Sequence, residues 1–163
     1  MLAFKINRTY TKVKINQELR DAKITQRDMD RLTRAAHYVF VDIFGLTPKW
    51  DITFEVHPEG DYDHIHGVDP HSIAFAHWPD HYHTGTVGIR VDVLKGDLEV
   101  LVSVLIHEAI HLTMASLTDT LNESVPQRLA PTVNSADEEF VSEMTAIFFQ
   151  QLRLSNIDKT LAS

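Results

Sequence analysis

The 163-residue sequence contains no cysteine, and this absence excludes several classes of site at once. Disulfides, thiol catalysis, iron–sulfur clusters and cysteine-ligated zinc all require that side chain. Any transition metal bound by this chain must therefore be held by histidine and carboxylate side chains. The hydrophobic share of 44% and the charged share of 23% further exclude a wholly disordered chain, a collagen-like chain and a coiled-coil rod.

Long hydrophobic runs are also lacking. No apolar run approaches the roughly 18 residues that a transmembrane helix requires, so we expect no membrane partner. Residues 1–15 alternate polar and apolar side chains and do not form the continuous apolar stretch of a secretory signal. We therefore expect a cytoplasmic protein. The chain length predicts a single domain over residues 1–163.

Positive charge is in short supply, with 15 Lys and Arg against 23 Asp and Glu and a net charge of −8. An acidic surface repels phosphate backbones, so we expect no nucleic-acid partner. Histidine, by contrast, is abundant. The sequence has ten histidines, and seven of them lie between His57 and His83.

The hydrophobic pattern predicts an α+β domain. Thr25 and Asp28 form a capping-box pattern at the start of a helix, and Gly45 ends that helix. Gly88 lies inside a predicted strand, which indicates a bulge or a close approach. Strands are predicted over 3–14, 50–56, 71–77 and 87–94, and helices over 25–44, 98–116 and 135–154. This order predicts a small twisted sheet of three or four strands packed on the central helix, with the first and last helices flanking it.

The central helix contains the pattern H-E-x-x-H at residues 107–111. Because residues four apart lie on one face of a helix, the imidazoles of His107 and His111 can converge on one zinc ion. Glu108 lies about 100° around the helix, beside the metal, and can take a proton from zinc-bound water. These polar side chains lie within an apolar stretch, where they are costly to bury without compensation.

A catalytic zinc site needs a third protein ligand. The metzincin continuation H-x-x-G-x-x-H fails, because Met114 and Leu117 occupy its remaining positions. Asp119 lies two residues beyond that register and stays a candidate. A Glu from the last helix is the other solution, since Glu138, Glu139 and Glu143 cluster near its start.

Helical phase distinguishes these carboxylates. Ser135 and Glu138 form a capping-box pattern, which gives Glu138 a structural role. Glu139 and Glu143 share a face, and Glu143 lies on an apolar stripe that is predicted to be core: Phe140, Met144, Ile147, Phe148 and Leu152. We favour Glu139 as the ligand and Glu143 as its support. The alternatives are Glu143, Glu138 or Asp119 as the ligand.

The segments GIRVDVL, LIHEAIHLTM and DEEFVSEMTAIFF follow one another in an order that resembles the gluzincins. Among the gluzincins, residues 70–155 most resemble the minimal phage-type and ImmA/IrrE-type metallopeptidases. The patterns N-E-x-x-S-D and E-A-N-x-F-A of related families are absent. The resemblance implies a zincin-like fold, zinc-dependent hydrolysis of a peptide or protein substrate, and residues 87–93 as the edge strand to which the substrate adds.

The histidine-rich stretch before the central helix has several interpretations. His64, His66 and His71 are candidates for a second metal site or a lid, or they are simply polar loop residues. His81 and His83, and also Tyr62, are candidates for stabilising the oxyanion of a transition state.

The hypothesis that results is a Zn²⁺-dependent metallopeptidase with His107, His111 and Glu139 as ligands and Glu108 as general base. The alternative is a catalytically inactive zinc-binding module that recognises a peptide or a protein. A nuclease is a third class, which the net charge of −8 disfavours.

Overall fold

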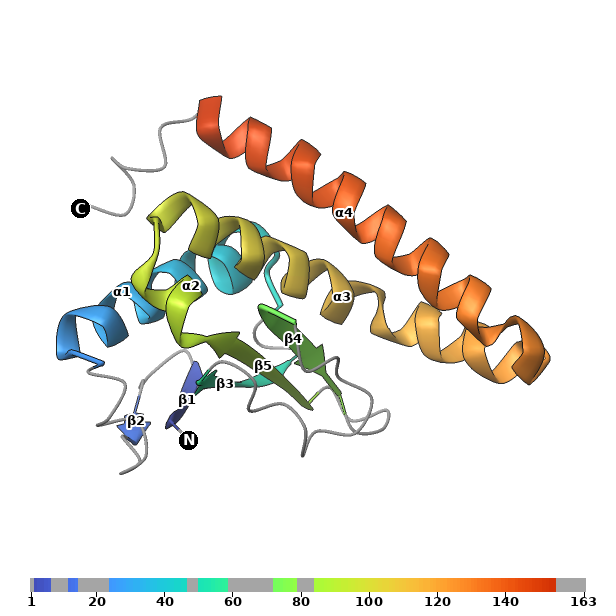
Figure 1. Ribbon diagram of the computed structural model, residues 1–163, viewed down its shortest axis with the longest axis horizontal. Helices are drawn as coiled ribbons and strands as arrows, with labels where there is room; N and C mark the ends of the chain where they lie inside the picture. The colour runs from blue at the N-terminus through green and yellow to red at the C-terminus, as the bar shows by residue number, and fades with distance from the viewer. Residues whose placement is uncertain are drawn as a thin grey trace.

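The computed structural model describes residues 2–6, 12–14, 24–46, 50–58, 72–78 and 84–154. A mixed sheet lies on one side, helix α3 packs across it, and α4 lies on the outer side of α3 (Figure 1). The elements are β1 (Leu2–Ile6), β2 (Lys12–Lys14), α1 (Gln26–His37), η2 (Tyr38–Ile43), β3 (Asp51–His57), β4 (Ala74–His77), β5 (Thr84–Arg90), α2 (Val91–Lys95), α3 (Leu98–Ser124), η3 (Gln127–Leu129) and α4 (Ala130–Leu154). The predicted α+β class is confirmed.

The sheet has five strands in the order β2-β1-β3-β5-β4, one more than the largest number predicted. β3 and β5 are parallel, and the other pairs are antiparallel. Since β5 is paired on both sides, the expectation that residues 87–93 form a substrate edge is wrong. The edge next to the helices belongs to β4. The predicted strand over 87–94 is also too long, because Val91–Lys95 forms the short helix α2.

Helix α3 is the central packing element. Leu101, Leu105 and Ala109 are fully buried, as the apolar sequence predicts. Its stretch Leu98–Leu121 is long and apolar enough to cross a membrane, with a mean hydropathy of 1.7 in its most apolar window. Core helices pass the same test, and 61% of that window is buried inside this protein.

The first helix follows its predicted signals. Thr25 accepts a hydrogen bond from the Asp28 amide, and the Asp28 carboxylate accepts one from the Thr25 amide, which forms the capping box. α1 continues into the π-helical turns of η2, and Gly45 then adopts a φ of 57°. This positive φ suits glycine, which has no Cβ to clash.

Helix α4 departs from its predicted start. It begins at Ala130 instead of Ser135, so Ser135 lies in the helix interior and cannot cap it. Of the predicted core stripe, Met144, Phe148 and Leu152 pack against the core. Phe140 and Ile147 do not, since they are 43% and 54% exposed. The ring of Phe148 lies 5.2 Å from that of Phe44, which ties α4 to the end of η2.

Gly88 allows the close approach that the sequence indicated. It pairs with Phe75 across β4 and β5, and the aromatic ring lies over the position that a Cβ at residue 88 would occupy. Gly85 on the same strand is different, because a Cβ there would meet the flexible end of Leu112 at 3.1 Å and Trp50 at an ordinary contact distance of 3.6 Å. The β4–β5 pair therefore depends on glycine at position 88 in particular.

We predict that Gly88→Ala lowers the free energy of unfolding by about 1–3 kcal/mol, the usual cost of overpacking a well-filled site. Gly85→Ala is the matched control and should cost clearly less, since the Leu112 side chain can yield. Urea denaturation of both variants measures the difference. Equal losses in the two variants would contradict the packing of Phe75 on Gly88.

Candidate metal centre

The imidazoles of His107 and His111 face each other on α3. Their Nε2 atoms lie 3.1 Å apart, and their rings are 4.8 Å apart at the centroids. The side chains are 25% and 11% exposed. The four-residue spacing of the sequence motif therefore brings two nitrogen donors together on the face of α3 that is turned toward α4, as predicted.

Glu138 of α4 is the third member of this cluster. Its Oε2 lies 3.6 Å from Nε2 of His107, and its Oε1 lies 3.4 Å from Nε2 of His111. All three donor atoms lie within 4.8 Å of one another, and they form a candidate metal site. The two imidazoles hold the pKa of the Glu138 carboxyl well below its usual range through hydrogen bonds, so this carboxylate is charged.

The structure brings Glu138 to the histidines in place of the favoured Glu139. Glu139 is the next residue on the helix, and both it and Glu143 are exposed and lie outside the cluster. The physical reason is the earlier start of α4, because Ser135 is not a cap and Glu138 has no capping role. Pro131, in the first turn of the observed helix, was the signal for this start, since proline is favoured there.

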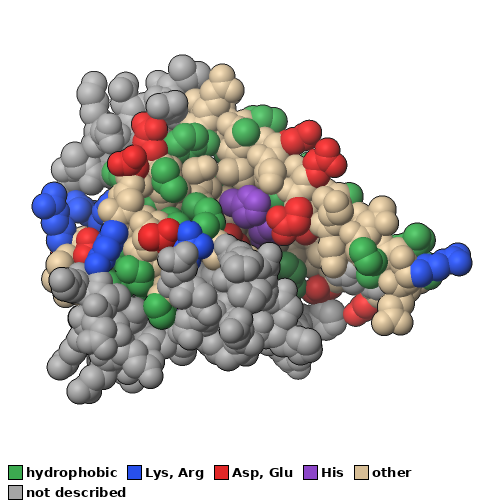
Figure 2. Space-filling model, in the orientation of Figure 1, with side chains coloured by type: hydrophobic (Ala, Val, Ile, Leu, Met, Phe, Trp, Pro, Cys, Tyr) green, Lys and Arg blue, Asp and Glu red, His purple; other side chains and the backbone are tan. Residues whose placement is uncertain are grey.

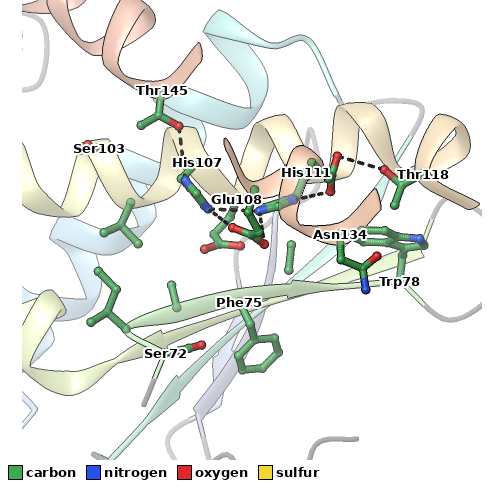
Figure 3. Close-up of a pocket in the computed structure, with 16 residues that line it drawn as sticks. Ser72, Phe75, Trp78, Ser103, His107, Glu108, His111, Thr118, Asn134 and Thr145 are labelled. Carbon is green, nitrogen blue, oxygen red and sulfur yellow. Dashed lines mark hydrogen bonds and ion pairs between the residues drawn. The ribbon is translucent and has the colours of Figure 1, made fainter. Parts of the chain in front are cut away.

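Glu108 is buried beside the cluster and is only 4% exposed. Burial raises the pKa of this carboxyl to about 8, against the opposing effects of His107 and of a hydrogen bond from the Ala76 amide. Glu108 is absent from the group of three donors. Its carboxyl group lies between α3 and strand β4, next to the cluster but not part of it (Figure 3).

A hydroxyl and a carboxylate hold the outer nitrogens of the two imidazoles. Oγ1 of Thr145 lies 3.5 Å from Nδ1 of His107 and donates its own hydrogen to the Val141 carbonyl at 2.7 Å. With that hydrogen engaged, Thr145 can only accept a hydrogen bond from Nδ1 of His107, which is the arrangement that a metal bound at Nε2 would require.

His111 has a similar partner. Its Nδ1 lies 3.6 Å from Oδ2 of Asp137, and Oδ1 of Asp137 accepts a hydrogen bond from Thr118 at 3.3 Å. Carboxylates in this position orient metal-binding imidazoles. Helix α4 therefore supplies three groups to the cluster, namely Asp137, Glu138 and Thr145.

The cluster lies in a cleft of about 870 Å³ between β4, α3 and α4. Ser72 and Ser103 lie at one end, and Trp78 and Asn134 lie at the other, beyond His111 (Figure 3). Figure 2 shows histidine and acidic side chains meeting near the centre of one face. The cluster is thus accessible from outside, and Glu138 is 63% exposed.

Other candidates from the sequence have different positions. Asp119 is outside the cluster and accepts a hydrogen bond from Nε1 of Trp78 at 3.0 Å. The candidates His81 and His83, together with Tyr62, His64, His66 and His71, lie outside the described residues.

Comparisons with protein-family models, curated proteins and solved structures gave no significant match to this chain. The interpretation of the site therefore depends on its own geometry.

We predict that Glu138→Gln weakens binding of divalent transition metals by at least about 100-fold. Loss of a residue that only hydrogen-bonds to a metal ligand already costs up to about 100-fold, and loss of a ligand should cost at least as much. Glu139→Gln, the adjacent exposed carboxylate, is the matched control and should bind as the native chain does. Isothermal titration with Zn²⁺ measures both affinities. The opposite ranking would return Glu139 to the site and remove Glu138 from it.

We also predict that Thr145→Val, which keeps the side-chain shape but removes the oxygen, weakens metal binding by about 10- to 100-fold. Thr113→Val is the control, because Thr113 makes the same kind of hydroxyl bond to a carbonyl four residues earlier, at 2.7 Å, and is exposed. Equal metal affinities in the two variants would show that Thr145 does not orient His107.

Proposed function

We propose that this protein is a zinc-dependent hydrolase of peptide bonds, with His107, His111 and Glu138 as metal ligands and Glu108 as general base. One observation carries the proposal. Three donors converge from two helices at the wall of an open cleft, and a buried carboxylate that is not among them lies directly beside them. Catalytic zinc sites combine three protein ligands with a position left open to water or substrate.

The spacing of the donors supports zinc. Zinc lies about 2.0–2.1 Å from nitrogen and oxygen ligands, and a tetrahedron of that radius has edges of about 3.4 Å. The two Nε2 atoms lie 3.1 Å apart, close to that edge. The separations of 3.4 and 3.6 Å to Glu138 involve its two different oxygens, and one donor atom from each residue lies within 4.8 Å of the others. Two histidines and a carboxylate also match the donor types that zinc accepts in hydrolytic sites.

Glu108 is suited to the proton transfers of hydrolysis. Zinc supplies a water of lowered pKa and polarises the carbonyl group of the substrate. Glu108 accepts the proton of the attacking water and returns it to the leaving amine. Glu108 is suited to both transfers by its position, because its buried carboxyl lies directly beside the three donors and is not one of them.

Strand β4 supports a peptide as the substrate. The carbonyl of Ile73 accepts a hydrogen bond from the Arg90 amide at 3.0 Å, so alternate residues of this segment bond to β5. The backbone groups of Ala74 and Ala76 therefore face away from β5. The Ala76 amide donates to Glu108, so the groups left along the cleft are the Ala76 carbonyl and both groups of Ala74. Extended peptides bind such edges by adding a strand. This edge replaces residues 87–93, the substrate edge that the family resemblance implied.

We predict that Glu108→Gln retains metal but lowers kcat for peptide hydrolysis by about 10²- to 10⁴-fold, the usual contribution of a general base. The assay uses quenched-fluorescent peptide pools, with metal content measured by mass spectrometry. Glu123→Gln, an exposed carboxylate near the end of the same helix, is the control and should remain active.

The outcomes distinguish the proposal from its alternative. Native protein that holds one zinc, binds peptides and cleaves none would identify a zinc-binding recognition module. Native protein that takes up no metal, freshly purified or on titration, would overturn the metal site itself.

A further inference from the structure

The wall that β4 presents to the cleft changes from small to large along the strand. Ala74, Ala76 and Trp78 are two residues apart, so their side chains share one face of the segment, and all three line the cleft. Phe75, in between, turns to the opposite face, where it covers Gly88. The cleft is therefore open beside the two alanines and bounded by an indole at the end beyond His111.

A hydrogen bond fixes the orientation of this indole. Nε1 of Trp78 donates to Oδ1 of Asp119 at 3.0 Å, which links residues 41 positions apart in the sequence. Because its only polar group is engaged with α3, the part of the indole that lines the cleft is hydrocarbon. Trp78 therefore offers a ligand apolar contact and no further hydrogen bond.

The surroundings of Trp78 define the chemistry of this end of the cleft. The other lining residues there are Thr118, which donates its hydroxyl to Asp137, and Asn134. The carboxylate of Asp119 accepts the indole hydrogen bond and that of Asp137 lines the cleft, so negative charge lies at this end. An acidic ligand side chain would be repelled, whereas an apolar or aromatic one would pack on the indole.

The strand geometry sets the position of this contact relative to the reacting centre. The Ala76 amide donates to Glu108, so Ala76 lies beside the proposed general base. Trp78 is two residues further along and directly follows the end of β4, so it lies at most about 6.6 Å further at the rise of an extended chain. A peptide added to this edge would place its residue two positions from the scissile bond against the indole.

We propose that Trp78, held by Asp119, is the specificity-determining residue of a subsite that selects a large apolar or aromatic side chain two positions from the scissile bond. This inference rests on the proposed peptidase function and identifies the substrate class of that same site.

The test is a profile of cleavage by the zinc-loaded full chain on peptides randomised at each position around the scissile bond. We expect Phe or Leu to exceed Asp and Ala by about 10- to 100-fold in kcat/KM at one position two residues away, the range typical of hydrophobic pockets. Trp78→Ala should reduce this preference to within about threefold and raise KM more than it lowers kcat. Trp78→Phe should retain most of the preference.

Further variants separate specificity from folding. Asp119→Asn keeps an acceptor for the indole and should preserve the preference, while Asp119→Leu should weaken it. Ile73→Ala changes an exposed residue at the other end of the cleft and should leave the preference intact. Thermal unfolding by circular dichroism identifies any variant that fails to fold, in which case Trp78→Phe and the two Asp119 variants carry the test.

Failure of this inference is distinguishable from failure of the proposed function. Cleavage by the native chain with no preference two positions away, or with a preference that Trp78→Ala leaves unchanged, overturns the role of Trp78 alone. Absence of both cleavage and peptide binding, the latter measured by fluorescence anisotropy on zinc-loaded Glu108→Gln, overturns the peptidase function and the subsite together.

Discussion

The Nε2 atoms of His107 and His111 lie 3.1 Å apart on the central helix α3. The surrounding structure has to supply hydrogen-bond partners or charges that stabilise two imidazoles at this distance. Two neutral imidazoles can share only one hydrogen bond between them, and two protonated ones repel each other. The compensation comes from α4, whose Glu138 faces both rings while Thr145 and Asp137 hold their outer nitrogens. The position of α4 and the orientation of the two imidazoles thus depend on each other.

The structure around the two imidazoles must also leave room for a ligand. Strand β4 lines the cleft with Ala74 and Ala76, whose small side chains leave space in front of the cluster, and Phe75 packs on the far side of the sheet. That packing is possible only because residue 88 has no side chain. A glycine on one face of the sheet therefore contributes to the geometry of the cleft on the other face.

The sequence predicted the parts of the site that depend on local periodicity. H-E-x-x-H predicted that His107 and His111 share a face of α3, which the structure shows, because helix phase alone determines this. The third ligand depends on how α4 packs against α3 and on where α4 begins. A capping-box pattern at Ser135 displaced the predicted start by five residues, and it assigned to Glu138 a role that the interior of a helix cannot provide.

The fold shows the same division between local and long-range information. The capping box at Thr25 and the turn at Gly45 were predictable because both signals are local. The pairing of β5 with both β3 and β4 was not, since strand order depends on contacts between distant segments. The helix at Val91–Lys95 escaped prediction because alternating residues in a short run fit a strand equally well.

The chain connects α3, which carries His107 and His111, to α4, which carries Glu138, through the turn around Pro126 and η3 at the end of the helix pair far from the cluster (Figure 1). A cation bound to His107, His111 and Glu138 would therefore cross-link the chain and close a loop of about 30 residues. Closing a loop of that length restricts the unfolded chain by roughly 3–4 kcal/mol in the entropic treatment used for disulfides. In a sequence without cysteine, the metal would then provide the kind of cross-link that a disulfide provides in other proteins.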